Sequence, residues 1–143
     1  MWFEPLWRLG WDDWGMFAGV LADAVLVVHG LFLVWAVFGV IAVWRWPWLA
    51  VLHLPAVAWG LWIETSGEVC PLTPLENSLR HAAGEEGYSG GFIEHYLGGV
   101  IYPAGLTRAA QWIAAGVLAL INVVPYSLLI VRTVRSRRAR PAR

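Results

Sequence analysis

The chain has 143 residues, of which 59% are hydrophobic and 14% charged, and its formal net charge is zero. An ordinary soluble globular domain carries about 25% charged residues, so the composition excludes that class. We therefore expect a single-domain integral membrane protein of the all-α class.

The N-terminal segment, residues 1–16, reads "MWFEPLWRLGWDDWGM" and mixes tryptophans with acidic residues without a clean helical period. This pattern predicts a tryptophan-rich strip that lies on the membrane surface before the first span. A secretory signal would instead begin with a basic patch, whereas Glu4, Asp12 and Asp13 outnumber Arg8 here. We expect the segment to stay on the protein.

Two nearly uncharged segments follow, residues 17–44 and residues 47–63. A membrane-spanning helix needs about 20 residues, so the first segment is long enough and the second is at the short end. The intervening "RWPW" places Pro47 at the start of the second helix and Arg45 between tryptophans. This predicts a tight turn at the membrane interface and an antiparallel helical hairpin.

Residues 64–107 are rich in acidic residues and glycines and predict an ordered polar cap outside the membrane. Within them, "TPLE" has the pattern of a capping box, in which Thr73 and Glu76 bond exposed backbone amides and Pro74 takes the first helical position. A short amphipathic helix should follow and end at Gly84.

The glycine-flanked stretch "GGFIEHYLGG", residues 90–99, predicts a second short helix that starts at Phe92 and stops at Pro103. At about 1.5 Å per residue this helix falls well short of the ~30 Å hydrocarbon core. We therefore expect an interfacial or re-entrant helix and three membrane crossings. Four crossings, with this helix as an additional span, are the alternative.

The last predicted span covers residues 109–131, and six of the ten arginines fall in the tail that follows, residues 132–143. Such a tail is typical of the cytoplasmic side. We expect a multi-pass protein of the bacterial cytoplasmic (inner) membrane with its C-terminus in the cytoplasm. Tryptophans expected to anchor the helices at the interfaces are Trp11, Trp14, Trp44, Trp46, Trp48, Trp62 and Trp112.

Ionisable side chains within apolar helices indicate a candidate site. His29 lies 17 residues before Trp46 and Glu64 lies 18 after it. In a regular hairpin both are therefore about 26 Å from the turn, at the outer rim of the membrane. Glu94 and His95 are expected to cover this rim, with Cys70 nearby. The site is then a structural His–Glu pair, a divalent-metal or redox site, or a cleft for a substrate, lipid or quinone.

Two further polar residues lie within the predicted spans. His53 is only 7 residues past Trp46, so it lies at a different depth from His29, and a haem held by these two histidines is geometrically disfavoured. We interpret His53 as a neutral histidine beside Pro55. Asn122 lies next to the carbonyl that Pro125 leaves without its helical donor, and we expect it to serve packing or partner recognition.

The sequence contains no serine elbow, phosphate loop, dinucleotide fingerprint, metalloprotease helix or haem-attachment cysteine pair. We therefore expect a non-enzymatic accessory or interaction component of the membrane. Its expected partners are the lipid bilayer and another membrane protein or a second copy, and not nucleic acid. The alternative is a redox protein that binds a divalent metal, haem or quinone at the His/Glu rim.

Five segments together carry a resemblance to a known family: "LADAVLVVHGLF", "WLAVLHLPAVAWGLWIE", "CPLTPLEN", "GYSGGFIEHYL" and "YPAGLT". Over about residues 21–126 the chain resembles the small bacterial integral-membrane proteins of domain-of-unknown-function family 2784. The resemblance implies a helical membrane fold and no particular activity. It also implies that the family's motif set includes His29, His53, Glu64, Cys70, Pro71, Glu76, Asn77, Glu94 and His95.

Overall fold

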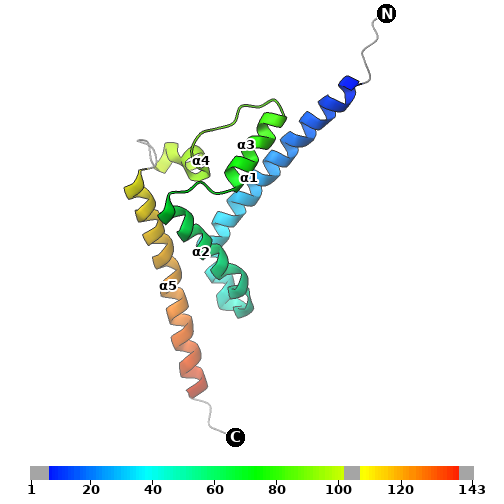
Figure 1. The fold of residues 1–143 in the computed structure, drawn as a ribbon. Helices are drawn as coiled ribbons and strands as arrows, with labels where there is room; N and C mark the ends of the chain where they lie inside the picture. The colour runs from blue at the N-terminus through cyan, green and yellow to red at the C-terminus, as the bar shows by residue number, and fades with distance from the viewer. Residues whose placement is uncertain (1–6, 102–106, 139–143) are drawn as a thin grey trace, which may run out of the picture. The chain divides into compact units, whose positions relative to one another are not determined.

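A computed structural model describes residues 7–101 and 107–138 (Figure 1). Within these ranges the secondary structure is all helical with no strand, which confirms the all-α part of the expected fold class. The elements in chain order are α1 (Trp7–Arg45), the 3-10 helix η1 (Pro47–Leu49), α2 (Ala50–Ser66), α3 (Leu72–Ala82), α4 (Phe92–Ile101) and α5 (Arg108–Arg138).

Helix α1 begins at Trp7, about ten residues before the start expected at residue 17. Residues 7–16 are therefore helical and continuous with the first apolar helix, and the prediction that this strip lies on the membrane surface stays a prediction. No proline interrupts this stretch, and Gly10 and Gly15 each weaken a helix by only about 1 kcal/mol. The long apolar helix that follows can therefore propagate through them. The first part of the predicted strip, residues 1–6, lies outside the described residues.

The turn predicted from "RWPW" is present. Helix α1 ends at Arg45, and Pro47 opens η1, where its fixed φ suits the first helical position. Helix α2 then folds back on α1, because the His53 ring lies against Gly39. Gly39 lies seven residues before Trp46 and His53 seven after it, so the hairpin is regular at this level.

The three remaining helices start close to their expected positions. Helix α3 ends at Ala82, and Gly84 has a φ of +78°, a conformation that favours glycine. Helix α4 has 10 residues and starts at Phe92 as expected, while the stop predicted at Pro103 lies outside the described residues. Helix α5 continues to Arg138, so the first seven residues of the arginine tail extend the last helix.

The chain forms two compact units that are described separately. Unit 1 comprises residues 1–31 and 69–106, which contain the first part of α1 together with α3 and α4. Ala18 and Ala22 are buried on one face of α1. Gly19 lies on the neighbouring face, where an added Cβ would be 3.6 Å from Ala83, the residue that caps the C-terminus of α3. Small residues on α1 thus allow α3 to pack closely.

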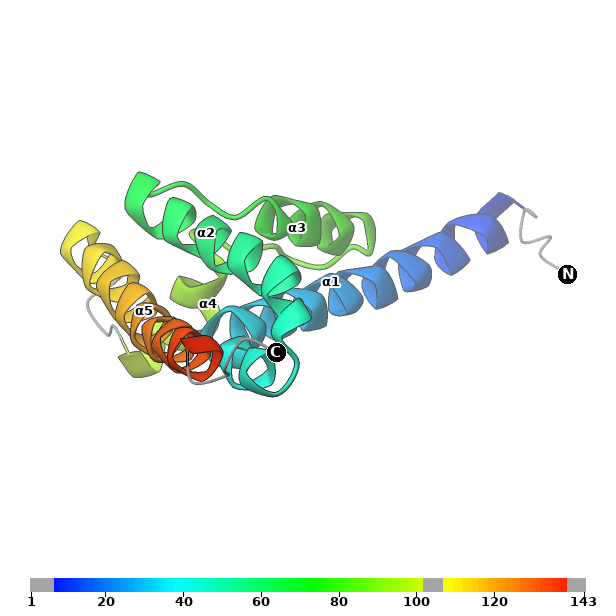
Figure 2. The ribbon, with the colours of Figure 1, turned by 90° about the horizontal axis from the view of Figure 1, so that it is seen from below.

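Unit 2 comprises residues 32–68 and 107–143, which contain the second part of α1, η1, α2 and α5. Figure 2 shows α2 beside both the end of α1 and α5, as the contacts of His53 with Gly39 and Tyr126 require. At Gly60 of α2 an added Cβ would lie 3.1 Å from Leu118 of α5. The core side chains are small or β-branched: Ala36, Val40, Val43, Ala56, Val57 and Ala115.

Two helices are long and apolar enough, by length and composition, to cross a membrane. They are the Trp14–Arg45 part of α1 and the Arg108–Ser136 part of α5, and only 22% and 17% of their most apolar windows are buried. Helix α2 is shorter, with 17 residues. The two apolar helices point to a membrane environment, and the expectation of a third crossing by α2 stays a prediction.

The contact at Gly39 leads to a prediction about the core of unit 2. In Gly39→Ala the new methyl group meets the buried His53 ring, with only 2.9 Å between the new Cβ and Nε2. We expect the free energy of unfolding to fall by about 1–3 kcal/mol, which is the usual cost of overpacking a core.

The matched control is Gly116→Ala on α5, where nothing lies within 4 Å of an added Cβ. Alanine is the better helix former, so this variant should be as stable as the wild type or more stable. Thermal unfolding of the purified proteins measures both. Equal stability of the two variants would show that His53 does not pack against Gly39.

Candidate functional site

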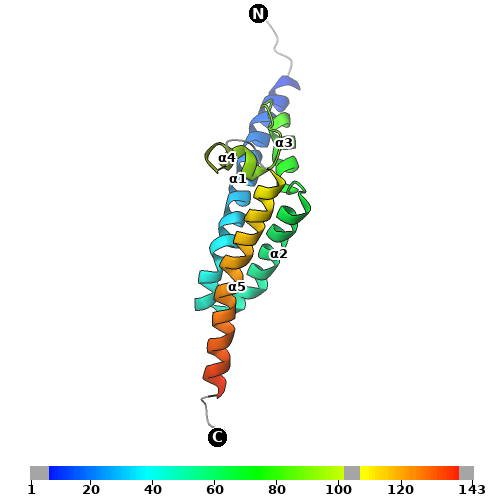
Figure 3. The ribbon, with the colours of Figure 1, turned by 90° about the vertical axis from the view of Figure 1, so that its left-hand side faces the viewer.

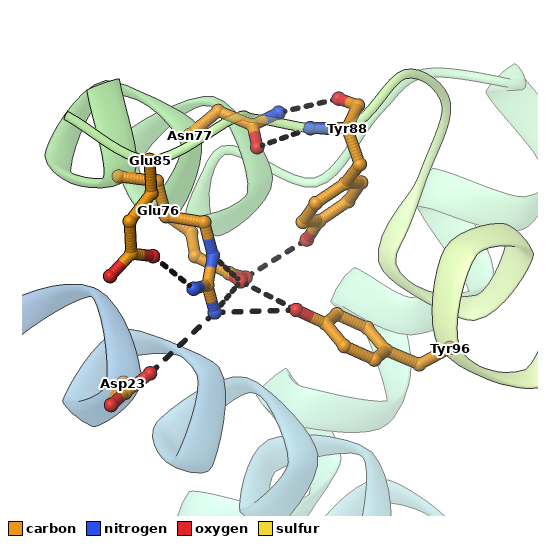
Figure 4. Close-up of polar contacts among 7 residues, drawn as sticks. Asp23, Glu76, Asn77, Glu85, Tyr88 and Tyr96 are labelled. Carbon is orange, nitrogen blue, oxygen red and sulfur yellow. Dashed lines mark hydrogen bonds and ion pairs between the residues drawn. The ribbon is translucent and has the colours of Figure 1, made fainter. Parts of the chain in front are cut away.

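The carboxylate of Glu76 on α3 is the most deeply buried acidic group of unit 1, with a relative exposure of 0%. Its Oε1 accepts hydrogen bonds from Arg80 Nε at 3.0 Å and from the Tyr96 hydroxyl at 2.9 Å. Its Oε2 accepts one from the Tyr88 hydroxyl at 2.9 Å. Figure 4 shows these donors around the carboxylate, which together with it form what we call the Glu76 cluster.

Arg80 connects this cluster to other parts of unit 1. It lies four residues after Glu76 on α3, so the two side chains share one helix face. Its Nη1 donates to Glu85 Oε2 at 2.9 Å, and its Nη2 lies 3.6 Å from Asp23 Oδ1 of α1. The Asp23 side chain is 72% exposed, so this pair is weak, and Glu76 is the main partner of the guanidinium.

Asn77 holds the loop that carries Tyr88. Its side-chain amide donates to the Tyr88 carbonyl at 2.8 Å, and its Oδ1 accepts from the Tyr88 amide at 3.1 Å. This pair of bonds fixes the backbone at Tyr88 against α3 (Figure 4). The Tyr88 phenol is thereby directed toward Glu76, which immediately precedes Asn77 on α3.

The cluster shifts the pKa of its members in the directions that keep every bond formed. Burial raises the pKa of Tyr88, and the hydrogen bond to Glu76 raises it further. The pKa of Tyr96 is raised by the same two causes. Burial alone would lower the pKa of Arg80, but its hydrogen bonds to Glu76 and Glu85 outweigh this effect and raise it. Both phenols stay donors and the guanidinium stays charged.

A layer of aromatic rings lies next to the cluster. The rings of Tyr88 and His95 stack with centroids 4.0 Å apart, and Tyr96 meets the edge of both. Phe92 packs against Tyr96 on one side and against His29 of α1 on the other, with 4.2 Å between the Phe92 and His29 centroids. Helix α4 is thus held in unit 1 by ring contacts as well as by the hydrogen bond from Tyr96 to Glu76.

The role of Glu76 differs from the expected capping box. Helix α3 begins at Leu72, one residue before Thr73, and its N-terminus has no side-chain capping bond. Pro74 therefore lies inside the first turn, and the Thr73 hydroxyl is buried without a partner. Glu76 binds a guanidinium and two phenols, which are stronger partners for a buried carboxylate than one backbone amide.

The residues of the expected outer-rim site are distributed as follows. His29 is 3% exposed, and its Nδ1 is buried without a hydrogen-bond partner. Glu94 is half-buried and His95 exposed on α4, and Cys70 is a half-buried free thiol. Glu64 belongs to unit 2, where its Oε2 is buried without a partner. The pairing of His29 with Glu64 stays a prediction.

Among residues 7–101 and 107–138, no group of three or more His, Cys, Asp or Glu side chains is arranged to hold a metal ion. The two adjacent candidate ligands, Glu94 and His95, instead contact neighbouring residues of unit 1. The His95 ring stacks on Tyr88, whereas Glu94 lies against Gly90, two residues before the start of α4.

Unit 2 contains a separate polar junction around His53 of α2, which is fully buried. A 2.9 Å hydrogen bond joins His53 Nδ1 to the hydroxyl of Tyr126 on α5, and the ring meets the edge of Trp35 of α1. Asn122 donates from Nδ2 to the carbonyl of Ala36 on α1 at 3.2 Å. This junction joins three helices, which agrees with a packing role for Asn122.

Sequence reasoning missed Arg80, Tyr88 and Tyr96 as members of a site. One signal was available, because Glu76 and Arg80 have the spacing of four that forms an ion pair on a helix. The two tyrosines lie 12 and 20 residues after Glu76 and follow no spacing rule. The sequence also linked His53 with Pro55 and gave no indication of Tyr126, 73 residues away.

These features define a small all-helical protein with two helices long and apolar enough to cross a membrane and a buried carboxylate cluster in unit 1. The chain belongs to the DUF2784 family, described as a protein of unknown function, whose model matches residues 19–127. The resemblance stated from the sequence is thus confirmed. No curated protein and no solved structure matched the chain.

The cluster leads to a prediction about stability. Glu76→Ala removes the acceptor of three donors and leaves the half-buried Arg80 guanidinium without its main partner. We expect the free energy of unfolding to fall by about 3–5 kcal/mol, as for one partner lost from a buried ion pair. Glu76→Gln keeps the shape and one acceptor oxygen and should lose less.

The matched control is Glu86→Ala, an exposed glutamate of the following loop, which should change stability by less than about 0.5 kcal/mol. Near-ultraviolet circular dichroism reports the environment of the tyrosines, and denaturant titration reports stability. If Glu76→Ala were as stable as Glu86→Ala, the cluster would not hold unit 1 together.

The raised pKa of Tyr88 predicts a loss of stability in alkali. An unfolded tyrosine releases its proton near pH 10, whereas the folded Tyr88 keeps it to higher pH. The stabilisation is therefore complete below pH 10 and decreases as the pH rises above 10. Tyr88→Phe should lower the free energy of unfolding by about 1.5 kcal/mol at pH 8 and flatten its decline above pH 10. Parallel pH profiles for both proteins would contradict the hydrogen bond.

Proposed function

We propose that the protein is a small polytopic component of the bacterial cytoplasmic membrane without an enzymatic activity of its own. Helices α1, α2 and α5 cross the bilayer, and α3 and α4 form a polar cap on its outer face. The C-terminus lies in the cytoplasm. The protein acts as an accessory or interaction component, with another membrane protein or a second copy as its partner.

The observation that carries this proposal is the exposure of large apolar side chains along all three long helices. In a soluble protein, a helix as apolar as α1 or α5 would be mostly buried, whereas about four-fifths of each window is open here. Helix α2 exposes apolar side chains in the same way. Examples are Val27, Leu31, Phe38, Ile41, Val51, Leu52, Trp62, Ile113, Leu120 and Ile130.

Helix α1 is also more than a targeting segment. Asp23 of α1 lies near Arg80, and His29 of α1 packs on Phe92 of α4. Removal of α1 would therefore expose the face on which α3 and α4 rest. These contacts support α1 as a permanent span of the mature protein.

The lengths of the helices support three crossings over four. Helix α4 has 10 residues, which at 1.5 Å per residue span about 15 Å, half of the hydrocarbon core. The arginines do not discriminate between the two topologies, because three crossings place Arg45 and the tail inside, and four place Arg8, Arg80 and the tail inside.

The non-enzymatic role is supported by the chemistry of the Glu76 cluster. Both oxygens of this carboxylate accept bonds from side chains of the same unit, so the group is not free to act as a base or a ligand. Purification in mild detergent tests the role. A monomer without a partner but with a stoichiometric metal or a haem absorbance band would refute it.

Cys70 provides a test of the topology, because it is the only cysteine and lies in the proposed cap. With three crossings, a membrane-impermeant maleimide should label Cys70 in intact spheroplasts without permeabilisation. In Cys70→Ser/Ser136→Cys the new thiol is at the end of α5 and should react only after permeabilisation.

Four crossings would put both positions on the cytoplasmic side, so both would be protected in intact spheroplasts. Carbonate extraction of the same membranes provides the second measurement. The protein should stay in the pellet, and release into the supernatant would contradict membrane integration altogether.

A further inference from the structure

The end of unit 2 at the α1–α2 turn contains a group of arginines that takes no part in the sites described above. Its position follows from the contacts between α2 and α5. Gly60 of α2 lies against Leu118 of α5, and His53 lies against Tyr126. As residue numbers fall by seven on α2 they rise by eight on α5, so the helices are antiparallel and in regular register.

This register can be extended to the turn. Trp46 lies seven residues before His53, so its level on α5 is about seven residues after Tyr126, near Thr133. Arg132 is therefore level with the turn. Figure 3 shows α5 continuing past the turn, and Arg138 lies about 8 Å beyond it at 1.5 Å per residue.

The arginines of this end form a stripe. Arg132, Arg135 and Arg138 are all exposed and follow at intervals of three, which keeps them within one face of α5. Arg45 adds a fourth positive charge at the turn, where its guanidinium lies 5.4 Å from the centroid of the Trp46 ring. We call these four residues the basic end.

No carboxylate side chain of unit 2 can neutralise this charge. The sequence has no aspartate or glutamate between residues 32 and 63 or between residues 109 and 143. The acidic residues of the unit, Glu64 and Glu68, are at the opposite end of α2, about 25 Å or more from the turn. The counter-charge of the basic end must therefore come from outside the unit.

The tryptophans show what surrounds the basic end. Trp44, Trp46 and Trp48 are exposed at the turn, and tryptophan prefers the headgroup level of a bilayer. The turn and Arg132 would thus lie among lipid phosphates, with Arg135 and Arg138 slightly further into the water. A guanidinium binds a phosphate with two parallel hydrogen bonds, which an ammonium group cannot do.

We propose that the basic end binds the phosphate groups of anionic phospholipids in the leaflet at the α1–α2 turn. The inference rests on the proposed membrane integration and adds a lipid class to it. Anionic lipid attracts each nearby arginine with roughly 1 kcal/mol, so the three α5 arginines give a strong preference over zwitterionic lipid. Lipids of this kind anchor α5 and fix its depth.

The experiment compares lipids bound to the full-length protein. Purified protein is incubated with equal amounts of phosphatidylglycerol and phosphatidylcholine that have the same acyl chains, and bound lipids are counted by native mass spectrometry. The variant Arg132→Gln/Arg135→Gln/Arg138→Gln removes the stripe. The control Thr133→Gln/Ser136→Gln places the same residue type on the same exposed segment and keeps every charge.

We expect the wild type and the control to prefer phosphatidylglycerol and the triple variant to lose about tenfold or more of that preference. An unchanged preference in the triple variant would overturn the proposal, as would the absence of any preference in the wild type. Displacement of the lipid by a short DNA duplex at physiological salt would also overturn it, in favour of a nucleic-acid ligand.

Carbonate extraction of the triple variant separates this inference from the proposed function. The variant should stay integrated, because its three apolar helices are unchanged. Integration together with an unchanged lipid preference would refute the lipid site alone. Release of the wild type from the membrane would refute the proposed function itself.

Discussion

The burial of the Glu76 carboxylate is the constraint on which unit 1 depends. Removing a carboxylate from water costs several kcal/mol even after relaxation, and only close donors and an opposite charge offset that cost. The donors come from three places: Arg80 from the same helix, Tyr88 from the loop and Tyr96 from α4. All three donors are needed together, because a buried carboxylate that is only partly hydrogen-bonded destabilises the fold more than an apolar side chain would. The hydrogen bond from Tyr96 to Glu76 thus ties α4 to α3, in addition to the ring contacts of α4.

Unit 2 joins its helices through neutral hydrogen bonds rather than through a buried ion pair like that of Glu76 and Arg80. His53 is bonded to Tyr126, and Asn122 donates to a backbone carbonyl of α1. Hydrogen bonds of this kind between apolar helices contribute about 1 kcal/mol or less each, so they add little to stability. They do define the register of α5 against α1 and α2, since a shift of α5 by one residue would break both hydrogen bonds. Packing of small residues brings the helices together, and the polar junction selects one of the arrangements that such packing allows.

The parts of this structure that could be predicted from sequence are those governed by local rules. The turn at Pro47 and the opposition of His53 to a residue seven before Trp46 follow from counting residues along a regular hairpin. The Glu76 cluster could not be found in this way, because its tyrosines come from a loop and from another helix. The "TPLE" pattern also suggested that Glu76 caps its own helix, whereas its carboxylate binds Arg80, Tyr88 and Tyr96 instead. The start of α1 was misjudged for a related reason, since a long apolar helix extends through a stretch without a helical period of its own.

The distribution of charge links the two units to the proposed topology. Residues 64–107 contain six carboxylates and a single arginine, Arg80, which is already engaged by Glu76 and Glu85. This region therefore keeps an excess of negative charge that no internal partner neutralises. In unit 2, Arg108 lies at the start of α5, whereas Arg45, Arg132, Arg135 and Arg138 lie at the turn and toward the end of α5, where the sequence has no acidic residue nearby. The proposed topology, with the arginines of the turn and tail inside and the acidic region outside, agrees with a membrane that is more negative on its cytoplasmic side. Under this topology, Glu76 and Glu85 hold the one arginine of the acidic region in a structural cluster, and the arginines of the turn and of the end of α5 are the cations that the proposed lipid site uses.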